Sequence, residues 1–292
     1  MKNGNKTASG YCRFLSEDAF DDLYKVFTEA FSDYVFPFAL TETQFRNHLN
    51  LNAVDLTRSV GYVENNELIG FSLNGFGDWK AKPTVYDAGT GVVPSERRRG
   101  VSRGMFEMMI PNFRAAGFEQ YLLEVVTSNA GARRLYDDLG FEKTRELALL
   151  QYDGSVKPVT PRHGAEIREI EEPDWALFQT FWDGKPSWQN TIEAVVRSAK
   201  LKRILGAFID GRCIGYLVFS ISFGRVAQLA VDHEHRRRGI ATSLVERMHA
   251  ETVTGYSVQV INIDKTLTNA IGFFRARGFY ERLSQYEMMK GL

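Results

Sequence analysis

Two short basic segments of this chain combine the residue types that bind anions. The segment from Arg97 to Ser102 (RRRGVS) returns as Arg236 to Ala241 (RRRGIA), at a separation of 236 − 97 = 139 residues. Arginine donates charge-assisted hydrogen bonds, and glycine lets the backbone approach a ligand closely. In both copies an apolar, strand-like stretch precedes the segment, and a helical pattern of apolar residues follows it. Because helix N-termini carry unpaired N–H groups and partial positive charge, each loop is expected to hold a pyrophosphate.

The repetition itself argues against the alternative, a basic loop that is only solvated. A Gly-Phe pair follows each copy, at Gly140-Phe141 and at Gly278-Phe279, a separation of 278 − 140 = 138 residues. Solenoid repeats span roughly 20–50 residues, so this period is the length of a whole domain. The chain therefore contains two copies of one fold, each with its own loop.

The loop resembles the coenzyme A loop of the GNAT acyltransferase superfamily, Arg-x-x-Gly-x-(Gly/Ala) between a strand and a helix. Downstream of the first copy, Asn129-x-x-Ala132-x-x-Leu135-Tyr136 and then Gly140 resemble the second motif of that family. The preceding Leu-Glu-Val is similar to the bacterial ribosomal-protein alanine acetyltransferases. The first loop departs from the pattern in having Ser102 where Gly or Ala is usual, but serine is also small.

The resemblance implies that the protein uses acetyl-CoA, or another short acyl-CoA, to acylate an amine. The implied binding residues of the first half are Val92, Val93, Arg97, Arg98, Arg99, Gly100, Val101, Ser102, Arg103, Gly104, Asn129 and Ala132. A second possible cofactor site comprises Val231, Arg236, Arg237, Arg238, Gly239, Ile240 and Ala241. The acceptor, a small molecule or a peptide, is not identified by the sequence.

Transfer from a thioester to an amine requires a base, donors to the carbonyl oxygen and a proton for the leaving sulfur. Glu124 lies within an apolar strand, where a carboxyl tends to have a raised pKa that suits a base. The resemblance places the base at Glu124 and the acid at Tyr136. Gly89 and Gly91 interrupt a strand, which predicts a bulge with a free backbone N–H. The alternatives are a salt-bridged glutamate, a tyrosine packed in the core and a plain strand irregularity.

The second half lacks these groups. At the 138-residue separation, Asn262 replaces Glu124, Leu267 replaces Asn129 and Phe274 replaces Tyr136. Asparagine cannot act as a base, and phenylalanine has no proton to donate. We therefore expect catalysis in the first half and a degenerate second half. Two alternatives stay open: a non-catalytic module that senses acyl-CoA, and catalysis in the C-terminal domain.

Composition limits the class of protein further. The 292 residues include 36 basic and 36 acidic ones, which gives no broad attraction to nucleic acid or to a membrane surface. Two cysteines in separate halves, Cys12 and Cys213, fit a reducing cytoplasm. No apolar run approaches the ~20 residues that cross a bilayer. His233 and His235 are too few for a metal site. We expect a cytoplasmic monomer or homodimer without a metal.

The order of elements predicts an α/β (α+β) fold: two tandem GNAT-like domains, each a mixed twisted sheet flanked by helices. The predicted divisions are a disordered lead at 1–10, a catalytic N-terminal domain at 11–152, a linker at 153–164 and a degenerate C-terminal domain at 165–292. Predicted helices include Glu172 to Phe181 and Trp188 to Ala199. Aromatic residues around Tyr34 to Phe38 belong either to the core or to an acceptor pocket with an apolar part.

Overall fold

The computed structural model describes residues 10–33, 40–154, 164–221, 224–252 and 257–292. Residues 1–9 of the expected lead, most of the expected linker and the segment Tyr34 to Phe38 lie outside these ranges. Contacts divide the chain into two compact units. The first comprises the residues up to Glu124, Gly131–Glu142 and Met288–Leu292, and the second comprises Val125–Ala130 and Lys143–Glu287.

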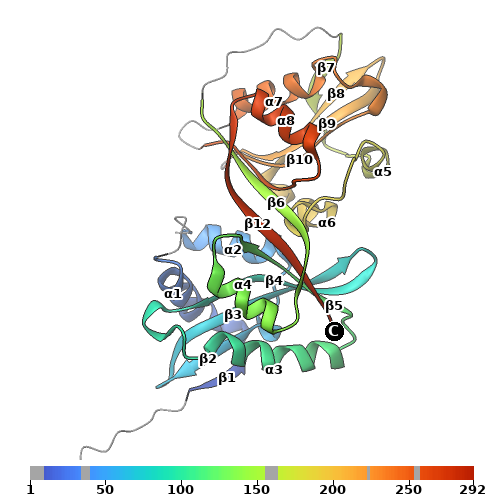
Figure 1. Cartoon of the computed structure of the whole chain (residues 1–292). Helices are drawn as coiled ribbons and strands as arrows, with labels where there is room; N and C mark the ends of the chain where they lie inside the picture. The colour runs from blue at the N-terminus through green and yellow to red at the C-terminus, as the bar shows by residue number, and fades with distance from the viewer. Residues whose placement is uncertain (1–9, 34–39, 155–163, 222–223, 253–256) are drawn as a thin grey trace, which may run out of the picture. The chain divides into compact units, whose positions relative to one another are not determined.

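Each sequence repeat is a mixture of strands and helices in matching order (Figure 1). The first repeat contains β1 (Tyr11–Phe14), α1 (Phe20–Ala30), α2 (Glu42–Leu51), β2 (Val60–Glu64), β3 (Glu67–Trp79), β4 (Lys82–Val92), α3 (Val101–Ala115), β5 (Gln120–Val126), α4 (Ala130–Asp138) and β6 (Glu142–Tyr152). The second contains β7 (Glu166–Glu169), α5 (Trp175–Gln179), α6 (Ile192–Arg197), β8 (Lys202–Ile209), β9 (Arg212–Ser220), β10 (Arg225–Val231), α7 (Ile240–Glu251), β11 (Gln259–Asp264), α8 (Thr268–Ala276) and β12 (Phe279–Gly291). This order confirms the predicted mixed α/β architecture.

Local sequence signals explain several boundaries. Thr41 caps α2, because its hydroxyl accepts the Gln44 N–H while the Gln44 side chain accepts the Thr41 N–H. The Asn65-Asn66 turn between β2 and β3 has φ of 52° and 65°, values that asparagine tolerates. The expected turn at Asp210-Gly211, between β8 and β9, has the same left-handed backbone.

One predicted helix of the second repeat is wrong. The residues from Trp188 to Ala199 form a 3₁₀ turn and the short α6, separated by Thr191, whose ψ of 163° is extended. Thr191 caps α6 through the Ala194 N–H. The preceding Asn190 is buried and bonds the Ile261 carbonyl of β11. Tertiary hydrogen bonding therefore overrides the helical pattern here. The predicted helix from Glu172 to Phe181 is also shorter, reduced to α5.

The parallel strands at the centre of each unit pair only where they begin. β4 and β5 are in register from Thr84↔Gln120 to Tyr86↔Leu122, and β10 and β11 only at Arg225↔Gln259 and Val226↔Val260. Just beyond these pairs the register of β4 against β3 shifts at Ala88, and that of β10 against β9 shifts at Ala227. A bulge bends its strand, so each pair of parallel strands diverges after a shared start.

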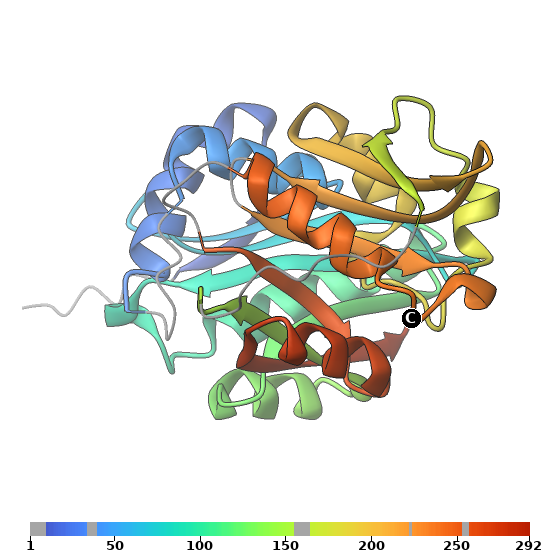
Figure 2. The ribbon, with the colours of Figure 1, turned by 90° about the horizontal axis from the view of Figure 1, so that it is seen from above.

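The helices cover the sheet of their own unit. In the first unit α3 packs on β2, β3 and β4, and α1 packs on β3 and β4. In the second unit α7 packs on β8, β9 and β10 (Figure 2). Apolar residues of each face are buried, among them Phe106 and Met109 of α3 and Leu244 and Met248 of α7. The periodicity that predicted these helices is therefore the periodicity of their packing.

The last strand of each repeat is exchanged with the other repeat. The Thr127 N–H, after β5, bonds the Ser284 carbonyl of β12, and the Lys265 N–H, after β11, bonds the Glu146 carbonyl of β6. The end of β12, Met288–Leu292, belongs to the first compact unit. The domain boundaries expected from the sequence stay a prediction, and this exchange gives each repeat a strand from the other.

A buried ion pair between the two exchanged strands, β6 and β12, is expected to be a point of high stability. Glu287 is fully buried, accepts bonds from the Thr144 hydroxyl at 2.7 Å and the Arg145 Nε at 3.0 Å, and pairs with a second Arg145 nitrogen. We expect Glu287→Ala to lower the free energy of urea unfolding by up to about 3–5 kcal/mol, because the buried Arg145 guanidinium loses its shortest ion pair and keeps Asp264, at 3.6 Å, as its acidic partner. Loss of the exposed Lys143–Glu146 pair through Lys143→Ala is the control, with an expected cost under ~1 kcal/mol. Equal costs of the two substitutions would contradict the expectation that the buried pair contributes more to stability than the exposed one.

Candidate active site

The two basic loops have the same backbone conformation. Arg98 and Arg237 have φ of 64° and 63°, and Gly100 and Gly239, the residues that precede α3 and α7, have φ of 81° and 93°. The preceding Arg97 and Arg236 are both extended, with φ of −68° and ψ of 161°. A turn of this kind can direct successive N–H groups toward an anion. The helix N-terminus that follows adds further N–H donors. The two loops therefore share one conformation, and pyrophosphate binding by them stays a prediction.

The first arginine of each loop fixes the loop to its own unit. The Arg97 Nε donates to the Val92 carbonyl at 3.1 Å, and the two terminal nitrogens each lie 2.7 Å from an Asp33 carboxylate oxygen. In the second unit Arg236 bonds the Val231 carbonyl at 3.0 Å and Asp183 at 2.9 Å. The hydrogen bond from Arg97 lowers the pKa of Asp33. Both arginines thus position the loop, and their contact with a ligand stays a prediction.

The remaining arginines differ in what holds them. Arg99 pairs with Glu64 at 2.8 Å and with Glu96, and Arg103 pairs with Asp138 at 2.7 Å. Arg98, Arg237 and Arg238 are exposed, and within the described ranges no acidic group lies at ion-pair distance from them. These last three are the cations best placed to meet an anion.

The other expected binding residues surround these loops. Val92 and Val93 are buried at the end of β4, and Val231 is buried at the end of β10. Val101 and Ile240 are buried at the first positions of α3 and α7, followed by the partly buried Ser102 and Ala241. The Gly104 N–H bonds the Gly100 carbonyl within the first turn of α3. The Asn129 N–H bonds the Val126 carbonyl, and in the second unit the Leu267 N–H bonds the Asp264 carbonyl in the same way. Ala132 lies in the first turn of α4.

The expected base, Glu124, is partly buried on β5 beyond the point where β4 and β5 diverge. Its Oε2 accepts a 2.7 Å hydrogen bond from the hydroxyl of Tyr86 on β4. The bond spans the two diverging strands and fixes the carboxylate. An ionised carboxylate held by a neutral donor is an arrangement that can accept a proton from an amine.

The expected acid, Tyr136, is buried on α4. Its ring makes edge contacts with Phe106 and Phe141 at centroid distances of 5.7 Å. Its hydroxyl lies 3.4 Å from Oδ2 of Asp87 on β4. Asp87 is buried, which raises the pKa of its carboxyl to about 6, although bonds from Thr90, Gly89 and Tyr136 oppose the shift. The sequence interpretation did not single out Asp87.

The bulge expected near Gly89 is present, but its N–H groups differ from the expectation. The inserted residue is Ala88, whose carbonyl is 2.8 Å from His48 Nε2. The Gly89 N–H is bonded to Asp87 Oδ1 at 2.9 Å and is therefore not free for a substrate carbonyl. The second unit has the same bulge with Gln228 in the place of Gly89, so glycine is not what produces it.

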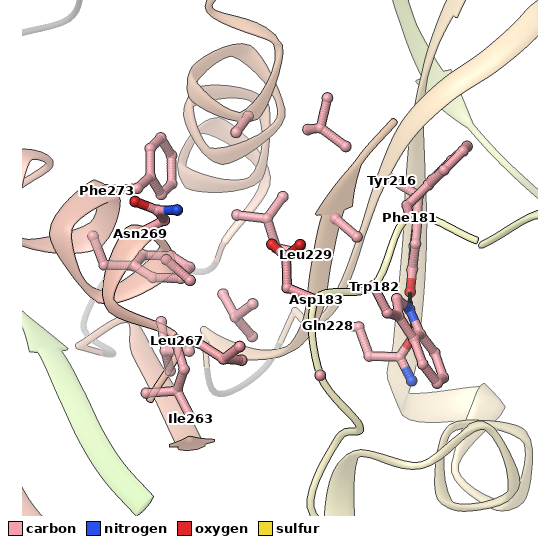
Figure 3. Close-up of a pocket in the computed structure, with 18 of the residues that line it drawn as sticks. Phe181, Trp182, Asp183, Tyr216, Gln228, Leu229, Ile263, Leu267, Asn269 and Phe273 are labelled. Carbon is pink, nitrogen blue, oxygen red and sulfur yellow. Dashed lines mark hydrogen bonds between the residues drawn. The ribbon is translucent and has the colours of Figure 1, made fainter. Parts of the chain in front are cut away.

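The second unit contains a cavity of about 710 Å³ that extends from its loop along the diverging strands β10 and β11. Figure 3 shows Leu267, Asn269 and Phe273 on one side of it and Phe181 and Trp182 on the other. Arg237, Gly239, Ile240 and Ala241 of the loop line it as well. Its size falls in the range of small-molecule sites, roughly 300–1,000 Å³.

A chain of hydrogen bonds forms one wall of this cavity. The Trp182 indole N–H donates to the Tyr216 hydroxyl at 2.6 Å, and that hydroxyl donates to Gln228 Oε1 at 2.8 Å (Figure 3). The Gln228 amide donates to the Asn190 carbonyl at 2.6 Å. Burial raises the pKa of Tyr216, so this phenol stays protonated at neutral pH. The wall is polar but uncharged.

The residues that replace the proposed acid and base also lie at this cavity. Asn262 is buried with a φ of 56°, where the register of β11 against β6 shifts, and Phe274 is buried on α8. A left-handed residue is uncommon within a strand, although asparagine tolerates this conformation. The second unit therefore has a loop and a cavity, with an amide and a phenyl ring where the first unit has a carboxylate and a phenol.

The described helices do not include one that is both long enough and apolar enough to cross a membrane. In the same ranges no three His, Cys, Asp or Glu side chains are grouped so as to hold a metal ion. Cys12 and Cys213 are free thiols.

Comparison with known proteins identifies the family. The Acetyltransferase (GNAT) family model matches residues 18–141, and the Acetyltransferase (GNAT) domain model matches residues 200–283. These matches cover more than half of the chain, which therefore belongs to the GNAT acetyltransferase superfamily and carries two such domains in tandem. No curated protein sequence matches the chain.

Solved structures share the tandem fold at low sequence identity. A GCN5-related N-acetyltransferase from Sphaerobacter thermophilus is 17% identical, with a TM-score of 0.71 over 97% of this chain and 95% of that one. A tandem GNAT protein from the clavulanic acid biosynthesis pathway is 16% identical, with a TM-score of 0.70 over 97% and 98%. A GCN5-related N-acetyltransferase from Kribbella flavida is 15% identical, with a TM-score of 0.63 over 99% and 73%. These likenesses concern the fold.

The buried carboxyl of Asp87 predicts a pH dependence of stability. Its pKa is raised from 3.8 to about 6, so the folded state holds this proton more tightly than the unfolded chain. Its stabilising contribution is complete below pH 3.8 and is lost as the pH rises through 6. A shift of about two pKa units corresponds to ~3 kcal/mol. The free energy of urea unfolding of Asp87→Asn, relative to that of wild type, should therefore rise by up to ~3 kcal/mol between pH 4 and pH 8. A difference that does not change with pH would contradict this.

The left-handed glycine of the first loop predicts a matched pair of substitutions. A Cβ at Gly100 would meet no atom within 4 Å, so only its φ of 81° opposes a side chain. We expect Gly100→Ala to lower the unfolding free energy by about 1–2 kcal/mol and to weaken acetyl-CoA binding in calorimetry. Gly100→Asn should cost less, because asparagine tolerates this conformation. Equal effects of the two variants would show that the backbone angle is not the reason for the glycine.

Proposed function

We propose that the protein is an acetyl-CoA-dependent N-acetyltransferase in which the first unit transfers the acetyl group directly to a primary amine. The proposal is carried by one observation: the two units share the loop conformation, while only the first has Glu124 and Tyr136 beside its diverging strands. The acetyl thioester would supply an activated acyl group when bound. The loop residues fit its diphosphate, since left-handed Arg98 and Gly100 orient N–H groups before α3.

The roles of the side chains follow from their positions. Glu124, fixed by the Tyr86 hydroxyl, would remove a proton from the amine. Tyr136 would donate its phenolic proton to the leaving sulfur. Arg98 would meet a phosphate, and Arg97 would keep the loop in place through Asp33. The aromatic rings of Phe106 and Phe141 pack against Tyr136 and hold its ring in place.

The cavity of the second unit favours a second, non-catalytic role. A space of about 710 Å³ beside Arg237 and Gly239 is suited to an acyl-CoA. Asn262 and Phe274 cannot exchange protons with an amine or a thiolate, so we infer binding without transfer there. The second unit would then act as a stabilising or sensing site. The location of the protein in the cell and its acceptor belong to the same proposal: a cytoplasmic enzyme for a small or peptide amine.

A screen for thiol release tests the proposed activity. Purified protein and acetyl-CoA are incubated with free amino acids, polyamines, aminoglycosides and peptides with a free N-terminus. At least one class should release CoA thiol in an amine-dependent reaction. Tyr136→Phe should then lower kcat and kcat/KM together by about 10²–10⁴-fold, because it removes a group used only in the transition state.

The control for this substitution makes the same chemical change at an exposed tyrosine. Tyr11 of β1 is 56% exposed, so Tyr11→Phe should leave turnover unchanged. If Tyr136→Phe retains full turnover while Gly239→Ala abolishes it, the active unit is the second one. If no amine class releases thiol, the sensing module becomes the better account.

A further inference from the structure

A buried carboxyl lies beside the proposed acid, and no cationic side chain of the described residues forms an ion pair with it. Asp87 Oδ2 is 3.4 Å from the Tyr136 hydroxyl, and Oδ1 accepts the Gly89 N–H at 2.9 Å. The Thr90 hydroxyl is 2.9 Å from Oδ2. The groups that face this carboxyl are therefore hydroxyls and one amide, together with the phenol of Tyr121 on β5, whose own proton goes to Asn74. A long contact in the ligand-free state is common for catalytic hydrogen bonds.

The second unit shows that the fold itself does not need these polar groups. At the same positions it has Val226 for Asp87 (226 − 87 = 139) and Phe274 for Tyr136 (274 − 136 = 138). Val226 and Phe274 are both buried in one apolar cluster. Leu229 likewise replaces Thr90 (229 − 90 = 139). The carboxyl, the phenol and the hydroxyl are thus absent together, as expected of groups that work as a set. A buried carboxyl is costly, so its retention in one unit points to chemistry.

We propose that Asp87 is a positioning residue that holds the phenol of Tyr136 and sets the direction of its proton. This proposal rests on the function proposed above. A neutral Asp87 donates to the phenol oxygen and leaves the phenol proton free for the departing sulfur. As that O–H bond breaks and an S–H bond forms, the Asp87 proton passes to the phenol oxygen, and bulk water restores it. An ionised Asp87 instead accepts the phenol proton and directs it away from the sulfur.

The pH at which this change of direction occurs lies near neutrality. Burial raises the pKa of Asp87 to about 6, and the Gly89 N–H and the Thr90 hydroxyl stabilise the carboxylate that remains after transfer. The ratio of turnover by Asp87→Asn to turnover by wild type therefore shows how ionisation of Asp87 affects proton donation by Tyr136. Asparagine donates a hydrogen bond at every pH, as the neutral acid does, so this ratio should rise as the pH increases from 5 to 8. A purely structural role predicts a constant ratio.

A double-mutant cycle in the full chain tests whether Asp87 acts through Tyr136. The variants are Asp87→Val, Tyr136→Phe and the two combined, a combination whose apolar pair the second unit already packs. At pH 5, where Asp87 is neutral, and with acetyl-CoA and the best amine of the screen, Asp87→Val should lower kcat by about 10–100-fold alone and by less than about threefold in the Tyr136→Phe background. The KM for acetyl-CoA should change by less than about threefold.

Each outcome of the cycle decides between accounts. Equal losses from Asp87→Val in both backgrounds, with a constant pH ratio, would overturn the proposed role of Asp87. Unchanged turnover in Tyr136→Phe would instead remove the proposed acid, which is a failure of the proposed function. If no amine is acetylated, the same cycle is measured by urea unfolding midpoints at pH 5 and pH 8. Additive midpoint shifts at both pH values would then overturn the pairing without reference to activity, and non-additive shifts would support it.

Discussion

Divergence of two parallel strands after a shared start is the constraint on which the rest of each unit depends. β4 and β5, like β10 and β11, pair over their first few residues. They then separate next to a bulge, which lies at Ala88 in β4 and at Ala227 in β10. Separated strands leave backbone and side chains accessible between them, and both basic loops begin where β4 and β10 end. The bulges occur at equivalent positions with different sequences, which makes them a property of the fold.

The same scaffold therefore supports two chemical environments. In the first unit a carboxylate held by Tyr86 and a phenol beside Asp87 lie along the diverging strands. In the second the strands border a cavity of about 710 Å³, and the hydrogen-bonded side chains of Trp182, Tyr216 and Gln228 in its lining are uncharged. Buried ionisable groups cost free energy, so their presence in one copy and absence from the other is informative. The anchoring of each loop by its first arginine, through Asp33 or Asp183, is common to both units.

The sequence was sufficient to predict what repeats. The duplicated loop, the Gly-Phe pairs and the apolar periodicity predict the element order and the tandem family, because these features are local in the chain. Other features depend on contacts between distant residues. The exchange of β6 and β12 leaves no local signal, and the break at Thr191 comes from the bond of Asn190 to β11. Asp87 was missed because it reads as one polar residue in a strand. A comparison of the two repeats would have found it, because Val226 stands at the position equivalent to Asp87.

The central claim is that both units offer the coenzyme loop while only the first has the groups for proton transfer. A crystal structure of the protein with CoA tests it most directly. The account predicts CoA phosphates on the N–H groups around Gly100, with the sulfur between β4 and β5 and within roughly 3–3.5 Å of the Tyr136 hydroxyl. CoA bound in the second unit alone, with its sulfur against Phe274, would contradict the account.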